Sequence, residues 1–259
     1  MIDERIYGGR SLLVVGAHAF DAEVIAGPLA ATAAKRGLDV TFLHLTMGEQ
    51  GHTSLSPAAY AEQKRAEADR FCARLGISWR ELGYPDAFLP DNDEVALKIA
   101  DVIRELKPDT IVTHWQGSWH KDHRAAANAT KSAVLYAALP TLERAHPAFS
   151  PSLLLFGENW EDDEGFAPSE LVDVSEGFET WREAITEYEL ARGLSSFPYV
   201  DYYSALYRMR GCLNGSMYAQ AFSTTSHSFN AGGGMFNAKN SSGSSGKARL
   251  SGCGCGGHG

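Results

Sequence analysis

Long hydrophobic runs are missing from this sequence of 259 residues. No stretch approaches the 18 or so apolar residues that a transmembrane helix needs, so we expect no membrane association. The first ten residues, MIDERIYGGR, carry charged side chains before a short apolar run at 11–17. Because that run is short and leads directly into polar residues, it is not typical of a secretory signal peptide. We therefore expect a cytoplasmic protein.

Cysteine and positive charge are also scarce. The chain has four cysteines and a net charge of −9. Four cysteines in a chain of this length do not make a disulfide framework. An acidic protein is a poor binder of phosphate backbones, so we expect no nucleic-acid partner. A small-molecule substrate and association into a homo-oligomer stay open.

Short aliphatic runs alternate with helical segments along most of the chain. The strands are expected at residues 12–15, 39–45, 77–82, 110–114, 153–156 and 170–174, and the helices at 22–36, 57–75, 91–106, 122–138 and 178–192. Strands that alternate with helices of this length are typical of βαβ units. The pattern predicts a single α/β domain over residues 1–225, with a Rossmann-like, mostly parallel sheet and helices on both faces.

The composition changes near the end of the chain. Residues 226–259 contain many of the 26 glycines and a serine-rich stretch, SSGSSG. Such a segment has few side chains that a folded core would bury. We expect residues 226–259 to form a disordered Gly/Ser-rich tail.

Polar residues follow two of the expected strands. His18 and Asp21 come after the first strand, while His114, His120 and His123 end or follow the fourth. In a mostly parallel sheet the loops at the carboxyl ends of the strands converge and bind ligands. Two imidazoles and one carboxylate suit a catalytic zinc with an open position for water. The sequence therefore predicts a metal site at this edge.

The motifs at these positions resemble those of the LmbE/PIG-L family of zinc-dependent N-acetylglucosaminyl deacetylases. The resemblance rests on AHxxDAE from residue 17 and on HxDH from residue 120, with weaker matches in TMGEQG, LGYPD and YAQAF. It covers residues 11–222. It implies a hydrolase that removes the N-acetyl group from an amino-sugar conjugate, with water activated on the metal.

The resemblance also implies roles for single residues. His18, Asp21 and His123 would be the ligands of Zn²⁺, or of another divalent transition metal. His120 would stabilise the oxyanion that forms on the amide carbonyl, and Asp122 would orient His120.

One position departs from the family pattern. The family's first motif carries an aspartate that acts as the general base, and this chain has Phe20 there. Phenylalanine cannot accept a proton, so Glu49 or His52 in the second loop is expected to replace the base. Two alternatives are a metal- and sugar-binding relative without turnover, and a hydrolase of a different amide.

Further residues are candidates for substrate binding. Lys64 and Arg65 lie on the second helix, where family members place a substrate-binding arginine, and the sequence does not choose between them. Asp86 in a Pro-Asp turn is a candidate for binding sugar hydroxyls, and Trp119 for stacking on a sugar ring. The acidic stretch 158–164 is interpreted as a solvated loop or as a lid over the site.

Overall fold

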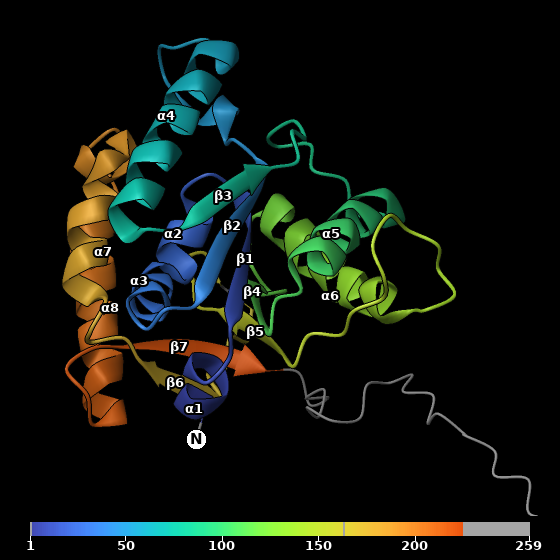
Figure 1. Cartoon of the computed structure of the whole chain (residues 1–259). Helices are drawn as coiled ribbons and strands as arrows, with labels where there is room; N and C mark the ends of the chain where they lie inside the picture. Colours follow the sequence, from blue (N-terminus) through green and yellow to red (C-terminus); the bar gives the residue numbers. More distant parts are fainter. Residues whose placement is uncertain (1, 163, 225–259) are drawn as a thin grey trace, which may run out of the picture.

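A seven-stranded sheet runs through the middle of the molecule (Figure 1). The computed structural model describes residues 2–162 and 164–224, so the predicted tail 226–259 lies outside the described residues. The strands stand in the order β3-β2-β1-β4-β5-β7-β6. They are β1 (Ser11–His18), β2 (Asp39–Thr46), β3 (Ser78–Glu81), β4 (Thr110–His114), β5 (Leu153–Gly157), β6 (Glu170–Asp173) and β7 (Ala219–Thr224).

Strand direction divides the sheet into two parts. Strands β1 to β5 pair in parallel, and β7 pairs antiparallel with both β5 and β6. The predicted α/β class with a mostly parallel sheet is therefore confirmed. Strand β1 has β2 on one side and β4 on the other. The connections from β1 to β2 and on to β3 therefore move toward one edge of the sheet, and those through β4 and β5 move toward the other edge. Such a switch point is where open α/β sheets bind ligands.

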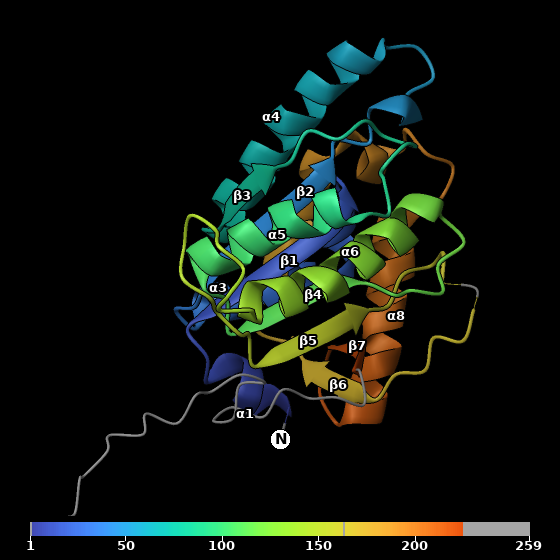
Figure 2. The same ribbon diagram turned by 90° about the vertical axis from the view of Figure 1, so that its right-hand side faces the viewer.

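Helices cover both faces of the sheet (Figures 1 and 2). Helices α5 and α6 pack on one face, and α2, α3, α4, α7 and α8 on the other. Helix α1 lies beside β6. The α-helices are α1 (Ile2–Tyr7), α2 (Asp21–Ile25), α3 (Gly27–Lys35), α4 (Pro57–Leu75), α5 (Asp93–Leu106), α6 (Lys121–Ala138), α7 (Phe178–Ala184) and α8 (Tyr199–Asn214). Three 3₁₀ turns add η1 (Glu49–Gly51), η2 (Ile185–Glu187) and η3 (Glu189–Arg192).

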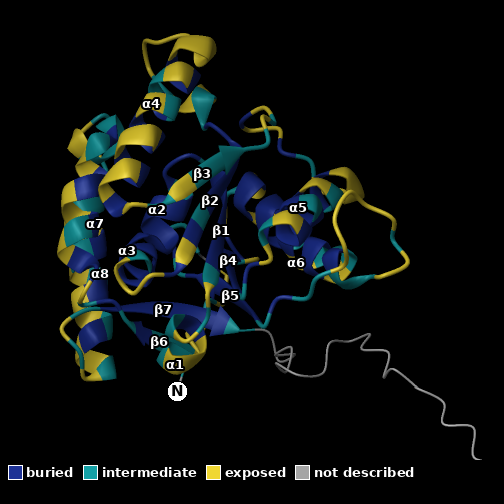
Figure 3. Cartoon of the chain, in the orientation of Figure 1, coloured by how far each residue is buried: buried dark blue, intermediate teal, exposed yellow. Residues whose placement is uncertain are grey.

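The central strands are buried on both faces, which explains their uninterrupted apolar sequence. Along β1, Leu12 and Val14 join the core under α2 and α3, whereas Leu13 and Val15 join the core under α5 and α6. Strands β1 and β7 are mostly dark blue in Figure 3 because they are buried, whereas β3 at the edge of the sheet is yellow and teal. Exposed residues gather on the outer sides of the helices. Among the described residues no helix is both long and apolar enough to cross a membrane.

Two predicted helices are wrong in extent. The segment 22–36 forms two helices instead of one, because the backbone leaves helical geometry at Ala26 (φ −145°, ψ 13°). Pro28 lacks an N–H, so it sits in the first turn of α3 and not in the middle of a longer helix. The segment 178–192 is α-helical only to Ala184 and continues as η2 and η3, since Tyr188 is extended. Helices α1 and α8 and strand β7 were not expected.

Candidate metal site

The candidate ligands lie at the carboxyl edge of β1 and β4. His18 ends β1 and Asp21 is the first residue of α2, so one short turn holds both. His114 ends β4, and His123 lies in the first turn of α6. The sheet brings these two turns together because β1 and β4 are paired neighbours.

One carboxylate oxygen is the meeting point of the cluster. Asp21 Oδ2 lies 2.9 Å from His18 Nδ1, 3.3 Å from His123 Nε2 and 3.2 Å from His114 Nε2. The rings of His114 and His123 stack with centroids 4.0 Å apart. His114 itself is completely buried and accepts a hydrogen bond from the backbone N–H of Ala17 at 2.9 Å. The structure therefore brings the three predicted ligands together and adds His114 behind them.

The donor set fits a divalent cation. Three overlapping groups of side chains place ligand-type atoms within 4.8 Å of one another, namely His18, His120 and His123; Asp21, His114 and His123; and His18, Asp86 and Asp122. Both carboxylate oxygens of Asp122 and Nδ1 of His114 are buried without a hydrogen-bond partner in the described part of the chain. Unpaired buried polar atoms are costly, and imidazole with carboxylate is a donor set that zinc accepts.

Burial and charge set the protonation states in the cluster. Burial alone would raise the pKa of Asp21, but His123 and His18 hold it well below its usual value. Burial lowers the pKa of His123 to about 3. Burial also opposes the charge on His18, yet Asp21 and two further carboxylates raise its pKa well above normal. A cation bound to His18 would compete with this proton.

His120 is the N-cap residue of helix α6 and lies at the front of the cluster. Its Nδ1 accepts the backbone N–H of Asp122 at 3.3 Å, and its ring stacks between Trp119 and His123 at centroid distances of 5.6 Å and 4.6 Å. Burial, followed by the charge of His18, lowers the pKa of His120. The Asp122 carboxylate faces His18, with one oxygen 3.5 Å from His18 Nε2. Asp122 contacts His120 through its backbone N–H instead.

A hollow of about 180 Å³ lies in front of the cluster, and some of the predicted substrate-binding residues line it. Lys64 lines this hollow and donates from Nζ to the carbonyl of Ala19 at 2.9 Å. Burial lowers the pKa of Lys64 to about 8. Asp86 also lines the hollow, and its Oδ1 lies 3.1 Å from His18 Nε2. Trp119 stands beside the hollow with 64% of its surface exposed.

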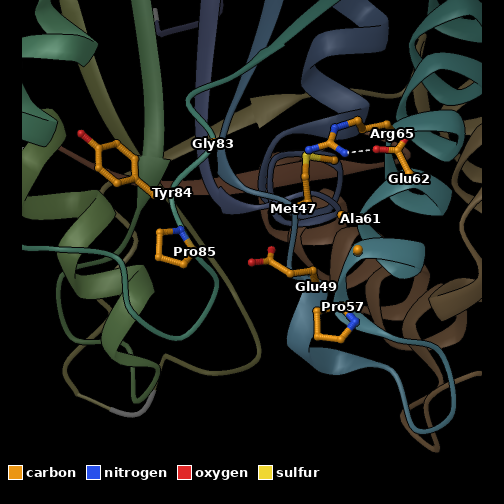
Figure 4. A pocket seen from close by; sticks show the side chains of 10 residues that line it. Met47, Glu49, Pro57, Ala61, Glu62, Arg65, Gly83, Tyr84 and Pro85 are labelled. Atoms are coloured by element: carbon orange, nitrogen blue, oxygen red, sulfur yellow. Dashed lines mark hydrogen bonds and ion pairs between the residues drawn. The ribbon is translucent and has the colours of Figure 1, made fainter.

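Other predicted residues lie outside this hollow. Glu49 and Arg65 line a second hollow of about 460 Å³, between α4 and the end of β3 (Figure 4). Arg65 pairs there with Glu62 and Glu81. Arg65 points away from the cluster on α4, whereas the preceding residue, Lys64, faces the cluster.

The two residues expected to replace the general base are engaged elsewhere. Glu49 accepts the backbone N–H of Asp86 at 2.9 Å. Nδ1 of His52 accepts the backbone N–H groups of Ser54 and Leu55 at 3.0 Å and 2.8 Å. Neither side chain lines the hollow in front of the cluster.

Phe20 occupies an unusual backbone conformation next to the cluster. Its φ of 98° lies in the left-handed region, which costs a bulky residue roughly 1–2 kcal/mol. The buried Glu23 accepts the Phe20 N–H at 2.9 Å and also accepts the hydroxyl of Tyr188 at 2.5 Å. His44 Nε2 lies 3.1 Å from the same Glu23. This buried network holds the turn that carries Asp21.

Glu161 is the residue that sequence reasoning missed. It lies in the loop after β5, and its Oε2 is 3.2 Å from Nδ1 of His123. The Glu161 carbonyl accepts the backbone N–H of Trp119 at 3.0 Å, which ties the loop to the cluster. Burial raises the pKa of Glu161 to about 7. The available signal was its place in an acidic stretch that follows a buried parallel strand.

A buried cluster of histidine and aspartate side chains lies at the switch point of a Rossmann-like sheet. The class is therefore an α/β protein with a candidate metal site. A family model described as "PIG-L: GlcNAc-PI de-N-acetylase" matches residues 13–134, which run from β1 into α6 and include all three predicted ligands. The chain belongs to the PIG-L (LmbE-like) family.

Relatives and solved structures agree with this membership. A 1D-myo-inositol 2-acetamido-2-deoxy-alpha-D-glucopyranoside deacetylase of Thermobifida fusca is 31% identical over 163 residues, which cover 51% of this chain and 57% of the relative. The match thus spans little more than half of that relative's length. The structure of a conserved protein from Thermus thermophilus is 30% identical with a TM-score of 0.73, covering 82% of this chain and 93% of that one.

One further solved structure is similar in fold. It is a 4-carboxy-2-hydroxymuconate hydratase from Pseudomonas putida, with 20% identity and a TM-score of 0.76. The alignment covers 83% of this chain and 96% of the hydratase. The fold is therefore shared with an enzyme whose name gives a reaction other than deacetylation.

Proposed function

We propose that this chain is a metal-dependent hydrolase that removes an acyl group from an amino-sugar substrate. The observation that supports this most strongly is the convergence of His18, His114 and His123 on one oxygen of Asp21. The family model and the Thermobifida relative carry names of deacetylases that act on amino sugars. Together they favour N-deacylation over other hydrolytic reactions.

Three side chains would hold the metal in this proposal. The ligand atoms are His18 Nδ1, Asp21 Oδ2 and His123 Nε2, which already lie against one another. Zinc is the preferred ion for this donor set, and another divalent transition metal is the alternative. When bound, zinc lowers the pKa of water from about 15.7 to about 7 and polarises a carbonyl group.

His120 would donate a hydrogen bond to the carbonyl oxygen of the reacting amide. Its Nδ1 accepts the N–H of Asp122, so in the neutral ring the proton is on Nε2. The lowered pKa of His120 favours this neutral form. A positioned donor of this kind stabilises the negative charge that develops on the oxygen. In this proposal Asp122 positions His120 through its backbone.

A carboxylate other than Glu49 would accept the proton of the attacking water. Among the described residues, the carboxylates that line the hollow are Asp21, Asp86 and Glu161. Asp21 is assigned to the metal, and Asp86 accepts the backbone N–H of Gln50 at 2.8 Å. Glu161 replaces Glu49 and His52 as our candidate because it lines the same hollow as Phe20, although its Oε2 also lies 3.2 Å from Nδ1 of the proposed ligand His123.

Lys64 and Asp86 would bind the sugar part of the substrate. Both line the hollow, and their opposite charges provide a donor and an acceptor for hydroxyl groups. Arg65 is not proposed for this role because it is paired with Glu81 and Glu62.

Release of acetate from a panel of N-acetylglucosamine compounds tests the proposal. The zinc-loaded protein is expected to release acetate and amine, and His123→Ala is expected to lose this activity together with its zinc. A zinc-loaded protein that binds these compounds but releases no acetate would contradict turnover. Such a result would support the alternative of a binding protein of the same family without turnover. This alternative arises because Phe20 replaces the aspartate that acts as the general base in the family.

A further inference from the structure

The hollow in front of the metal cluster has two chemically different walls. One wall carries the histidines and carboxylates described above. The other wall is apolar and is built by residues from four separate segments, namely Phe20, Val24, Trp160, Leu190 and Tyr199. Val24 and Phe20 are almost completely buried, whereas 42% of Trp160 is exposed at the mouth of the hollow. A sugar with only hydroxyl groups would leave this second wall without a complementary partner.

The aromatic rings of this wall are linked into a row through Phe197, which itself does not line the hollow. Phe20 contacts Tyr199 with centroids 5.0 Å apart, Tyr199 contacts Phe197 at 4.8 Å, and Phe197 stacks on Trp160 at 4.4 Å. Tyr188 supports Phe20 from behind at 5.2 Å. Edge-to-face and stacked contacts of this kind hold each ring in place, so the wall is formed before a ligand arrives.

The backbone at Phe20 has an unusual conformation directly beside the proposed metal ligand Asp21. A left-handed φ of 98° is uncommon for residues other than glycine, asparagine and aspartate, and a bulky side chain there is an outlier. Such outliers are concentrated at ligand-binding positions. Because Phe20 directly precedes the proposed ligand Asp21, its ring borders the place where the reacting carbonyl would bind.

The size of the hollow is compatible with an aromatic group. Its volume is about 180 Å³, and an apolar cavity of roughly 150 Å³ accommodates benzene. Lys64 and Asp86, which would bind the sugar, line the same hollow, so the acyl group would occupy the part beside the apolar wall.

We propose that the hollow binds an acyl group of aromatic size and that Phe20 is the residue that selects it. This inference rests on the proposed function. The substrate class is then an N-acyl amine whose acyl part is benzoyl-like. Water adds to the amide carbonyl, the C–N bond breaks, the nitrogen takes a proton, and an aromatic carboxylic acid and an amine leave.

Affinity for two hydroxamates tests the inference without the need for turnover. Acetohydroxamate and benzohydroxamate share a metal-binding head and differ in the apolar group. Calorimetry on the zinc-loaded protein is expected to give at least about tenfold tighter binding of benzohydroxamate, as burial of an aromatic ring predicts. Turnover of N-benzoylglucosamine is likewise expected to exceed that of N-acetylglucosamine.

Variants of the wall separate this effect from general affinity. Phe20→Asn keeps a residue that tolerates the left-handed backbone and is expected to remove most of the preference for benzohydroxamate. Trp160→Ser, on another loop, is expected to reduce the preference as well. Phe88→Ala removes an exposed ring outside the hollow and is the matched control, with an unchanged ratio.

The outcomes distinguish the inference from the function on which it rests. Equal affinity for both hydroxamates in the unaltered protein, or a ratio that Phe20→Asn and Trp160→Ser leave unchanged, would overturn the inference alone. Efficient release of acetate without any benzoyl preference would do the same. If neither hydroxamate binds in a zinc-dependent manner, the metal site fails and the proposed function fails with it.

Discussion

At the scale of single residues, Glu161 and Phe20 distinguish this chain from the pattern that its motifs follow. Phe20 removes a carboxylate from the turn beside the cluster, and Glu161 brings a carboxylate from another loop to within 3.2 Å of His123. Both residues line the same hollow. They are 141 positions apart in the sequence, so only the fold relates them.

The proposed role of Glu161 makes a sharp prediction. Glu161→Gln keeps an oxygen that can accept a hydrogen bond from His123 but removes the proton acceptor. We expect kcat to fall about 10²–10⁴-fold while zinc content and KM stay nearly unchanged. Steady-state kinetics and metal analysis measure these quantities.

A control from the same loop keeps this experiment specific. Glu164→Gln changes an exposed carboxylate nearby and is expected to keep full activity. If Glu161→Gln were as active as Glu164→Gln, another group would be the base.

At the scale of elements, the sequence predicted what is local and missed what depends on packing. The central parallel strands were predicted because they contain short runs of buried aliphatic residues, and His18, Asp21 and His123 were proposed as ligands because they end or follow such strands. At the start of α3, Trp181 packs where a side chain at position 27 would lie, a contact that no local pattern predicts. Helix α8 was missed because polar residues interrupt its apolar pattern. The approach of Glu161 to His123 depends on the loop after β5, which no local motif marks.

The contact between α3 and α7 can be tested by stability. A Cβ at Gly27 would lie 2.3 Å from Cδ1 of Trp181, so Gly27→Ala forces the two helices apart. Overpacking of this kind costs about 1–3 kcal/mol in the free energy of unfolding, which urea denaturation measures. At Gly51 the added Cβ would meet only Tyr60 at 4.0 Å, so Gly51→Ala is the control. Equal stability of the two variants would contradict the packing described for α3.

At the scale of the whole molecule, topology explains why the site lies where it does. The crossovers leave β1 in opposite directions, and this opens the carboxyl edge between β1 and β4. The two turns that follow these strands supply His18, Asp21 and His123, and α4 and the loop after β5 add Lys64 and Glu161. The parallel sheet thus determines the position of the histidine–aspartate cluster, while the peripheral helices and loops complete the hollow beside it.

The most direct test of this account is a crystal structure of the zinc-soaked protein with anomalous scattering measured at the zinc edge. We expect one strong peak bound by His18 Nδ1, Asp21 Oδ2 and His123 Nε2 at about 2.0–2.2 Å, with His120 facing the open position. A peak on other residues, or no peak at this edge of the sheet, would contradict the central claim.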